Sequence, residues 1–301
     1  MTRSHRWTAA DIPDQTGRSF VVTGSNTGIG LATTAALTAR GARVIMACRN
    51  AEKAEAARAG LPAAARELAH VRRLDLADLD SVAEFVENAD SLGPIDVLIN
   101  NAGLMNIPHG LTAQGHEMQF GVNTLGHHAL TAGLAPHLMD RVVWLGSIMH
   151  RFGTVDPDDL DRTRRRYSPM PVYADSKLAC VMLAYEQQRR LDAAGSSLRA
   201  VAAHPGYSAT DLQYRSGSRL QDLAMKAAEL IPFLVQPAER GALPELYAAT
   251  VPSLPGGSYV GPDGPGELTG HPKVVDSTRA SHDREVAAAL WKRCAEMTAQ
   301  T

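Results

Sequence analysis

Short apolar runs rich in β-branched residues alternate with longer helical stretches along the chain, and this pattern continues past residue 200. Such alternation is typical of βαβ units, in which helices cover both faces of a parallel sheet and the strands are apolar on both sides. It predicts an α/β fold, a single-domain Rossmann-type doubly wound parallel sheet flanked by helices. The expected strands are Ser19–Thr23, Arg43–Ala47, Val71–Leu74, Asp96–Ile99, Arg141–Leu145 and Leu198–Ala203.

Helical patterns lie between these strands, and no linker interrupts them. We therefore expect residues 1–301 to form one domain, with 211–301 as a C-terminal extension within it. In this extension the Gly/Pro-rich segment Leu254–Leu268 is expected to carry a short last strand and Glu285–Met297 a terminal helix. The other expected helices are Ile29–Arg40, much of Ala51–Leu68 with a break at Gly60 and Pro62, Leu79–Ala89, most of Gly115–Leu138, and Val172–Ala194.

Composition excludes several classes of protein. The chain has 301 residues, of which 45% are hydrophobic and 21% charged, so global disorder is not expected. A net charge of −2 gives no electrostatic reason to expect nucleic acid as a partner. Its three cysteines form no CxxC pair, which argues against disulfides and a metal site. A polar N-terminus and the absence of a long apolar stretch predict a cytoplasmic protein without a membrane span.

A glycine-rich turn follows the first expected strand directly. The segment T-G-S-N-T-G-I-G, Thr23–Gly30, places glycines at 24, 28 and 30 just before a helix. Glycines there let the backbone turn tightly and approach a pyrophosphate, which meets the positive end of the helix. The spacing is not G-x-G-x-x-G, and glycines also serve as plain turn residues. Because a strand precedes the turn and a helix follows it, we interpret it as a dinucleotide site.

The end of the second strand bears on the choice of cofactor. An NAD site usually has an acidic residue there for the ribose hydroxyls, whereas an arginine suits the 2′-phosphate of NADP. This strand ends in A-C-R-N, with Arg49 and no acid before Glu52. Arg49 therefore favours NADP, with NAD still possible; the alternative is an ordinary surface arginine.

A phenol and an ammonium lie four residues apart in V-Y-A-D-S-K, at Tyr173 and Lys177. On a helix they share one face. A lysine near a phenol favours the phenolate over the neutral form, whose usual pKa is about 10, and such a phenol is suited to proton transfer near neutral pH. The alternative is a helix face on which both residues are merely solvated.

With T-G-S-N-T-G-I-G, N-N-A-G and Y-A-D-S-K in order between about residues 18 and 210, the chain resembles the short-chain dehydrogenase/reductase family. The segments A-C-R-N, N-N-A-G-L-M and G-P-D-G-P-G-E-L are similar to its retinol-dehydrogenase-like branch. The resemblance implies that Ser147 orients a substrate carbonyl, Tyr173 donates its proton, Lys177 assists Tyr173 and holds the nicotinamide ribose, and Asn123 supports a water-linked proton relay. Where the family often has serine, this chain has Gly146.

The resemblance also implies the cofactor site. It assigns Asp75 and Leu76 to the adenine, and Pro205, Gly206 and Thr210 to the surroundings of the nicotinamide. Together with the glycine-rich turn and the end of the second strand, the full set of candidate cofactor-binding residues is Gly24, Ser25, Asn26, Thr27, Gly28, Ile29, Gly30, Arg49, Asn50, Asp75, Leu76, Asn101, Ala102, Gly103, Tyr173, Lys177, Pro205, Gly206 and Thr210.

The main functional hypothesis is an NADP-dependent oxidoreductase that interconverts a carbonyl and an alcohol on a lipophilic small molecule. Two alternatives remain open: a non-catalytic dinucleotide-binding sensor or scaffold, and a reductase of an activated C=C bond. The insert Ile148–Pro171, residues 211–301 and an apolar wall are expected to shape the substrate pocket. The candidates for this wall are Leu104, Met105, Tyr207 and the region Leu220–Leu234. The family resemblance also suggests a homodimer or homotetramer.

Several polar residues are not assigned to the site. Adjacent residues on a helix point in different directions, so His127 and His128 are expected at a helix surface or in packing, not on a metal. His150 lies close to Ser147 but fits an ordinary loop residue equally well. The basic run Arg162–Tyr167 follows the acidic V-D-P-D-D-L-D, which favours local charge compensation over a phosphate site.

Overall fold

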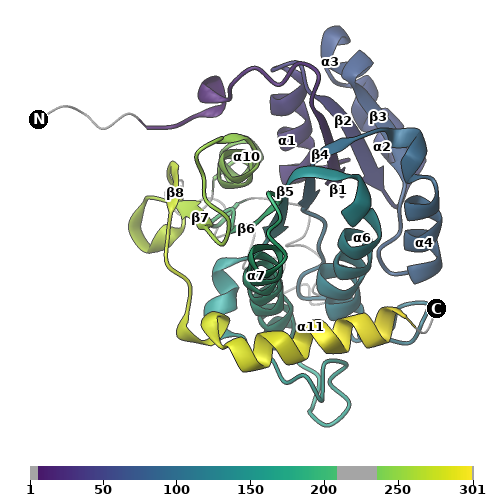
Figure 1. Cartoon of the computed structure of the whole chain (residues 1–301), viewed down its shortest axis with the longest axis vertical. Coiled ribbons are helices and arrows are strands. Elements are labelled where there is room, and N and C mark those ends of the chain that lie inside the picture. The colour runs from purple at the N-terminus through teal and green to yellow at the C-terminus, as the bar shows by residue number, and fades with distance from the viewer. Residues whose placement is uncertain (1–5, 209–235, 300–301) are drawn as a thin grey trace, which may run out of the picture.

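A twisted, mostly parallel sheet forms the centre of the computed structural model, which describes residues 6–208 and 236–299 (Figure 1). Within these residues eight strands pair in the order β3-β2-β1-β4-β5-β6-β7-β8, parallel except for β8. This order confirms the predicted doubly wound sheet. The strands are β1 (Ser19–Thr23), β2 (Arg43–Cys48), β3 (Ala69–Arg73), β4 (Ile95–Asn100), β5 (Leu138–Leu145), β6 (Arg199–Ala203), β7 (Tyr259–Pro262) and β8 (Pro272–Val274).

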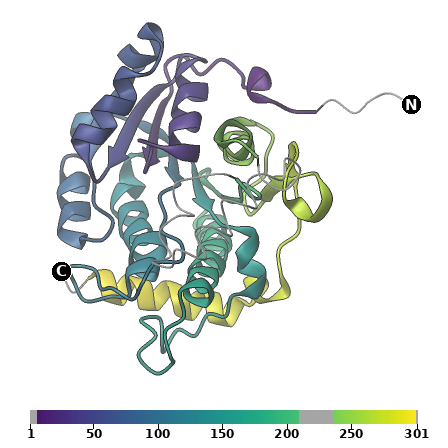
Figure 2. The same ribbon diagram turned by 180° about the vertical axis from the view of Figure 1, so that it is seen from behind.

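Helices cover both faces of the sheet, as Figures 1 and 2 show from opposite sides. One face carries α1 (Gly28–Thr38), α2 (Ala51–Ala59), α3 (Ala63–Leu68), α9 (Ala238–Gly241) and α10 (Leu243–Thr250). The other carries α4 (Leu79–Glu87), α5 (Met118–Phe120), α6 (Gly126–Leu134) and α7 (Pro169–Ala193), with α11 (Arg284–Thr298) packed across α6 and α7. No helix in the described ranges has both the length and the apolar character needed to cross a bilayer.

Two apolar cores result, one on each face of the sheet. Alternate residues of each strand point to opposite faces, so Val21 faces α4, α6 and α7 whereas Phe20 and Val22 face α1 and α10. Trp144 in β5 is fully buried, and its indole N–H donates a hydrogen bond to Oε1 of Gln187 at 2.8 Å. Burial of a large apolar side chain contributes about 1.5–3 kcal/mol to the free energy of folding. The buried side chains of the central strands therefore hold the sheet firmly between the two layers of helices.

Most predicted elements lie within a few residues of their expected bounds, and the helical region expected over most of Gly115–Leu138 is confirmed. Its helical path begins at Met118, because the carboxylate of Glu117 accepts hydrogen bonds from the N–H groups of Gln119 and Phe120. It contains a π-helical turn at Gly121–Leu125 and ends before β5, which starts at Leu138. The sequence analysis missed α10 and β8.

A buried carboxyl group lies between α10 and α1. Glu245 is fully buried, and its Oε1 accepts a hydrogen bond from the hydroxyl of Thr33. Its other oxygen, Oε2, has no hydrogen-bond partner among the described residues. Burial raises the pKa of Glu245 from 4.5 to about 7, because desolvation penalises the charged form.

This raised pKa predicts a pH-dependent loss of stability. The stabilising contribution of protonated Glu245 is complete below pH 4.5 and is lost as the pH rises through about 7. Above a pH of about 7, this loss lowers the free energy of unfolding of the wild type by about 3 kcal/mol. Glu245→Gln should keep its free energy of unfolding across this window, measured by urea denaturation at pH 5 and pH 8. Glu239→Gln, at an exposed carboxylate of α9, should follow the wild type. Identical pH profiles for all three proteins would contradict the assignment.

Candidate active site

A cavity of about 940 Å³ opens at the carboxyl ends of the strands, where the strand order reverses between β1 and β4. Ligands of doubly wound sheets bind at this switch point. The cavity brings together most of the residues predicted for the site. Those that line it are Gly24, Asn26, Thr27, Gly28, Ile29, Gly30, Arg49, Asn50, Asp75, Leu76, Asn101, Ala102, Gly103, Ser147, Tyr173, Lys177, Pro205 and Gly206.

Three predicted residues are not on this lining. Ser25 is buried, and its hydroxyl donates to the carbonyl oxygen of Val22 at 3.0 Å. Asn123 lies behind the wall, where its Nδ2 donates to the carbonyl oxygen of Leu104 at 2.9 Å and its Oδ1 accepts from the N–H of Leu104 at 2.7 Å. It therefore holds the loop after β4 in place. Thr210 lies outside the described residues.

The glycine-rich turn packs tightly against the loop after β4. Gly24 has a φ of +66°, and a Cβ added there would lie 2.9 Å from Cβ of Ala102. At Gly30 a Cβ would lie 2.5 Å from Nδ2 of Asn101 and 2.7 Å from the carbonyl oxygen of Gly24. Because α1 begins in this turn, its unpaired N–H groups lie at the cavity. The turn thus fits the pyrophosphate of a dinucleotide.

A buried hydrogen-bond network also holds the glycine-rich turn against the loop after β4. The hydroxyl of Thr23 lies 2.8 Å from Nε2 of His127 and accepts from the N–H of Ala102 at 2.9 Å. The other ring nitrogen, Nδ1, lies 3.0 Å from the carbonyl oxygen of Asn123. Burial lowers the pKa of His127 to about 3, so the ring is neutral. Its Nδ1–H then donates to Asn123 and its Nε2 accepts from Thr23, which confirms the predicted packing role.

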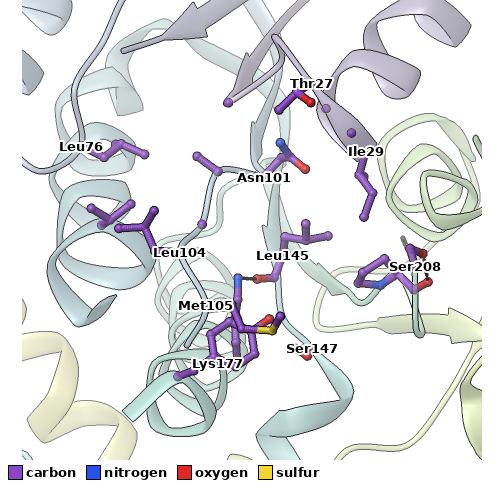
Figure 3. Close-up of a pocket in the computed structure, with 18 of the residues that line it drawn as sticks. Thr27, Ile29, Leu76, Asn101, Leu104, Met105, Leu145, Ser147, Lys177 and Ser208 are labelled. Carbon is purple, nitrogen blue, oxygen red and sulfur yellow. Dashed lines mark hydrogen bonds between the residues drawn. The ribbon is translucent and has the colours of Figure 1, made fainter. Parts of the chain in front are cut away.

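Ser147, Tyr173 and Lys177 line one part of the cavity. Ser147 and Lys177 are labelled in Figure 3. Lys177 is buried, its Nζ donates to the carbonyl oxygen of Leu145 at 2.8 Å, and it lies 5.9 Å from the centroid of the Tyr173 ring. The Ser147 oxygen accepts from the N–H of Met149 at 3.2 Å, which leaves its proton available to a ligand. Tyr173 makes no hydroxyl hydrogen bond within the described ranges, so its phenol is also available.

The glycine that departs from the family pattern has a packing explanation. A Cβ at Gly146 would lie 3.0 Å from Cγ2 of Val181 and 3.3 Å from the hydroxyl oxygen of Tyr259, both tighter than ordinary contacts. Tyr259 belongs to β7 and is fully buried beside His150, whose ring centroid is 5.3 Å away. His150 is therefore a packing residue in this structure and does not line the cavity.

Two cations lie at the edge of the cavity where the second strand ends. Arg49 and Lys53 are exposed, and neither forms an ion pair within the described part of the chain. Asn50, which lies between them in the sequence, is the N-cap of α2. Its Oδ1 accepts a hydrogen bond from the N–H of Lys53 at 2.8 Å. The sequence analysis missed Lys53, although its place one helical turn beyond Arg49 could have indicated it. Two cations at this point fit a phosphate better than a pair of hydroxyl groups.

Apolar side chains line the cavity near Ser147 and Tyr173. The predicted wall residues Leu104, Met105 and Tyr207 are among them, whereas Leu220–Leu234 lies outside the described residues. The insert Ile148–Pro171 reaches the cavity only at its two ends, through Ile148, Met149 and Met170.

The middle of this insert is held by ion pairs. Arg165 contacts Asp159 at 2.9 Å, and Arg162 pairs with Asp175 of α7. The Arg165–Asp159 pair confirms the predicted local charge compensation, whereas Arg162 pairs with a carboxylate outside the acidic segment. In residues 6–208 and 236–299, no group of three or more His, Cys, Asp or Glu side chains is arranged to hold a metal ion.

Comparison with known proteins identifies the family. Residues 18–156 match the family model described as short chain dehydrogenase. Human retinol dehydrogenase 13 is 37% identical over 297 residues, which cover 96% of this chain and 86% of that protein. The chain belongs to the short-chain dehydrogenase/reductase family. Within it the chain falls in the retinol-dehydrogenase-like branch, and it is an oxidoreductase.

Solved structures of similar proteins agree with this assignment. An uncharacterised protein from Mycobacterium paratuberculosis is 43% identical, with a TM-score of 0.83 and coverage of 98% of both chains. A short-chain dehydrogenase from Burkholderia cenocepacia J2315, solved in complex with NADP, is 26% identical with a TM-score of 0.63, covering 82% of this chain and 96% of that one. As a member of the short-chain dehydrogenase/reductase family, the chain is expected to use a nicotinamide dinucleotide.

The close approach at Gly30 predicts a binding defect. Gly30→Ala should weaken NADPH binding by roughly tenfold or more, because overpacking of this kind costs about 1–3 kcal/mol and displaces the turn. Fluorescence titration of the purified protein would measure the change. Gly110→Ala is the matched control, since its added Cβ would meet only Cβ of Met118 at 3.9 Å. Equal affinities for the two variants would contradict the proposed role of this turn.

Proposed function

We propose that the protein is an NADP-dependent oxidoreductase that interconverts a carbonyl and an alcohol on a lipophilic small molecule. The observation that carries this proposal is the arrangement of Ser147, Tyr173 and Lys177 on one cavity, with both hydroxyl groups available to a ligand. A protein that only sensed or displayed a dinucleotide would not need a serine and a tyrosine facing the same space beside a buried ammonium.

The residues divide the proton chemistry between them. When bound, the nicotinamide supplies or accepts a hydride. In the reductive direction Ser147 donates a hydrogen bond to the substrate oxygen and orients it, and Tyr173 donates a proton to that oxygen. The nearby charge of Lys177 stabilises the resulting phenolate. In the oxidative direction Tyr173 accepts the proton of the alcohol. Asn123 supports resupply of protons through water by holding the loop at Leu104.

The two cations at the cavity edge support NADP as the preferred cofactor. Arg49 and Lys53 are exposed and are not neutralised by an acid within the described ranges, so they suit the 2′-phosphate. The NADP complex of the Burkholderia relative is consistent with this choice.

Apolar lining and the named relative support a lipophilic substrate. Leu104, Met105, Met149 and Met170 surround the space near Tyr173, and unbranched methionines adapt to extended apolar ligands. The name of human retinol dehydrogenase 13 refers to retinol, which is a lipophilic alcohol. We further propose that the chain acts as one domain, with 211–301 as a C-terminal extension that contributes to the substrate pocket. None of its described residues, 236–299, lines the cavity.

Removal of the phenol tests the mechanism. Tyr173→Phe should bind NADPH as the wild type does but lose turnover by about 10²–10⁴-fold, because only the proton donor is removed. The assay follows NADPH oxidation with lipophilic aldehydes from nonanal to all-trans-retinal, and product analysis separates alcohol formation from C=C reduction. Wild-type turnover in this variant would refute the mechanism. NADPH binding by the wild type without turnover on any aldehyde would favour the sensor hypothesis.

Cofactor preference rests on the two cations. Arg49→Ala should weaken NADPH binding by roughly tenfold to a hundredfold, since a charge-assisted contact contributes about 1.5–3 kcal/mol, and should leave NADH binding unchanged. Lys53→Ala should show a smaller loss with the same selectivity. Arg58→Ala is the control, because this arginine of α2 pairs with Glu55 and does not line the cavity. Equal losses for NADPH and NADH would contradict the 2′-phosphate assignment.

A further inference from the structure

The branch motif G-P-D-G-P-G-E-L contains a carboxylate that contacts two segments of the site from outside the cavity. Oε2 of Glu267 lies 3.0 Å from Nε2 of His204, and its Oε1 lies 2.8 Å from Nη2 of Arg151. His204 directly precedes the turn Pro205–Ser208, which lines the cavity. Arg151 belongs to the 3-10 helix Ile148–Phe152, whose N-cap is Ser147. One side chain thus joins the turn after β6 to the helix after the serine.

The contact with His204 determines how that ring is protonated. His204 is fully buried, and burial lowers its pKa, so the ring is neutral near pH 7. Its Nδ1 accepts a hydrogen bond from the N–H of Gly206 at 3.3 Å, so the proton must lie on Nε2, where it is donated to Glu267. The carboxylate therefore selects the tautomer that leaves an acceptor for the backbone of the cavity turn.

The backbone around Glu267 is held in an unusual conformation. Glu267 has a φ of +59°, a left-handed geometry that is uncommon for residues other than glycine and tends to persist where surrounding contacts enforce it. The next residue, Leu268, accepts a hydrogen bond from the N–H of Tyr207 at 2.7 Å. A Cβ at Gly206 would overlap that same carbonyl oxygen. The motif and the cavity turn are thus interlocked through both backbone and side chains.

We propose that Glu267 is a positioning residue for the reaction: through His204 it fixes the Pro205–Gly206 turn, and through Arg151 it fixes the helical segment that begins at Ser147. The proposal rests on the proposed function, since these segments are taken to hold the nicotinamide and the substrate oxygen. Glu267 touches neither ligand. Its loss should misalign the reacting groups and leave the dinucleotide affinity, set mainly at β1, β2 and α1, nearly unchanged.

Three substitutions separate the carboxylate from the backbone conformation. Glu267→Ala removes the carboxylate and keeps the unfavourable φ, Glu267→Gly removes both, and Glu267→Gln keeps an oxygen that accepts from His204. Asp263→Ala is the matched control, because this carboxylate of the same loop accepts from the N–H of His271 at 2.8 Å and does not contact His204 or Arg151. The measurements are kcat with the best aldehyde of the panel, the Kd for NADPH, and the isotope effect on kcat with NADPH deuterated at the transferred position.

We expect the Ala and Gly variants to lose at least tenfold in kcat, with the Kd for NADPH within threefold of wild type and a larger isotope effect as hydride transfer slows. Glu267→Gln should recover part of kcat, and Asp263→Ala should keep the wild-type value. Wild-type kcat in Glu267→Gly would overturn the proposal, and so would a Gln variant no better than Ala. If Tyr173→Phe also keeps full turnover, the proposed function fails with it; if Tyr173→Phe is inactive, only the role of Glu267 is refuted.

Discussion

The close approach of the β1–α1 turn to the loop after β4 is the constraint on which the rest of the site depends. The two segments meet at Gly24, Gly30, Asn101 and Ala102 with no room for an added methyl group. This contact brings the N-terminus of α1 to the switch point of the sheet and sets the depth of the cavity. The glycine-rich turn and the helix that carries Tyr173 and Lys177 line the same cavity.

Buried, uncharged polar side chains hold the other segments around the cavity in place. His127 links Thr23 to the helical path that contains Asn123, and Asn123 in turn holds the backbone at Leu104. None of these side chains faces the cavity. Since burial keeps His127 uncharged at working pH, the network introduces no charge beneath the ligand. The only buried cation that faces the cavity within the described ranges is Lys177, and it is oriented by a carbonyl oxygen of β5.

Much of the fold and the site could be predicted because the relevant signals are local in sequence. A strand followed by a glycine-rich turn and a helix predicts the β1–α1 unit, and helical spacing alone places Tyr173 and Lys177 on one face. The errors arose where a distant or irregular contact decides the structure. The cap at Glu117 and the π-helical turn at Gly121–Leu125 were not indicated by the periodicity, and β8 pairs with β7 only because the chain folds back. Glu267 gave no periodic signal, and its partners His204 and Arg151 are recognised only once the fold is known.

The insert Ile148–Pro171 contributes to the cavity only through its ends, and its centre is held to the body of the protein by the pair Arg162–Asp175. Asp175 lies on α7 between Tyr173 and Lys177, so the loop is attached to the same helix that carries the proposed catalytic pair. The Arg162–Asp175 pair thus holds the centre of the loop apart from the two ends that line the cavity. Substitutions at Met149 and Met170, which lie at the two ends of the loop, can therefore change the shape of the proposed substrate pocket without disturbing this attachment.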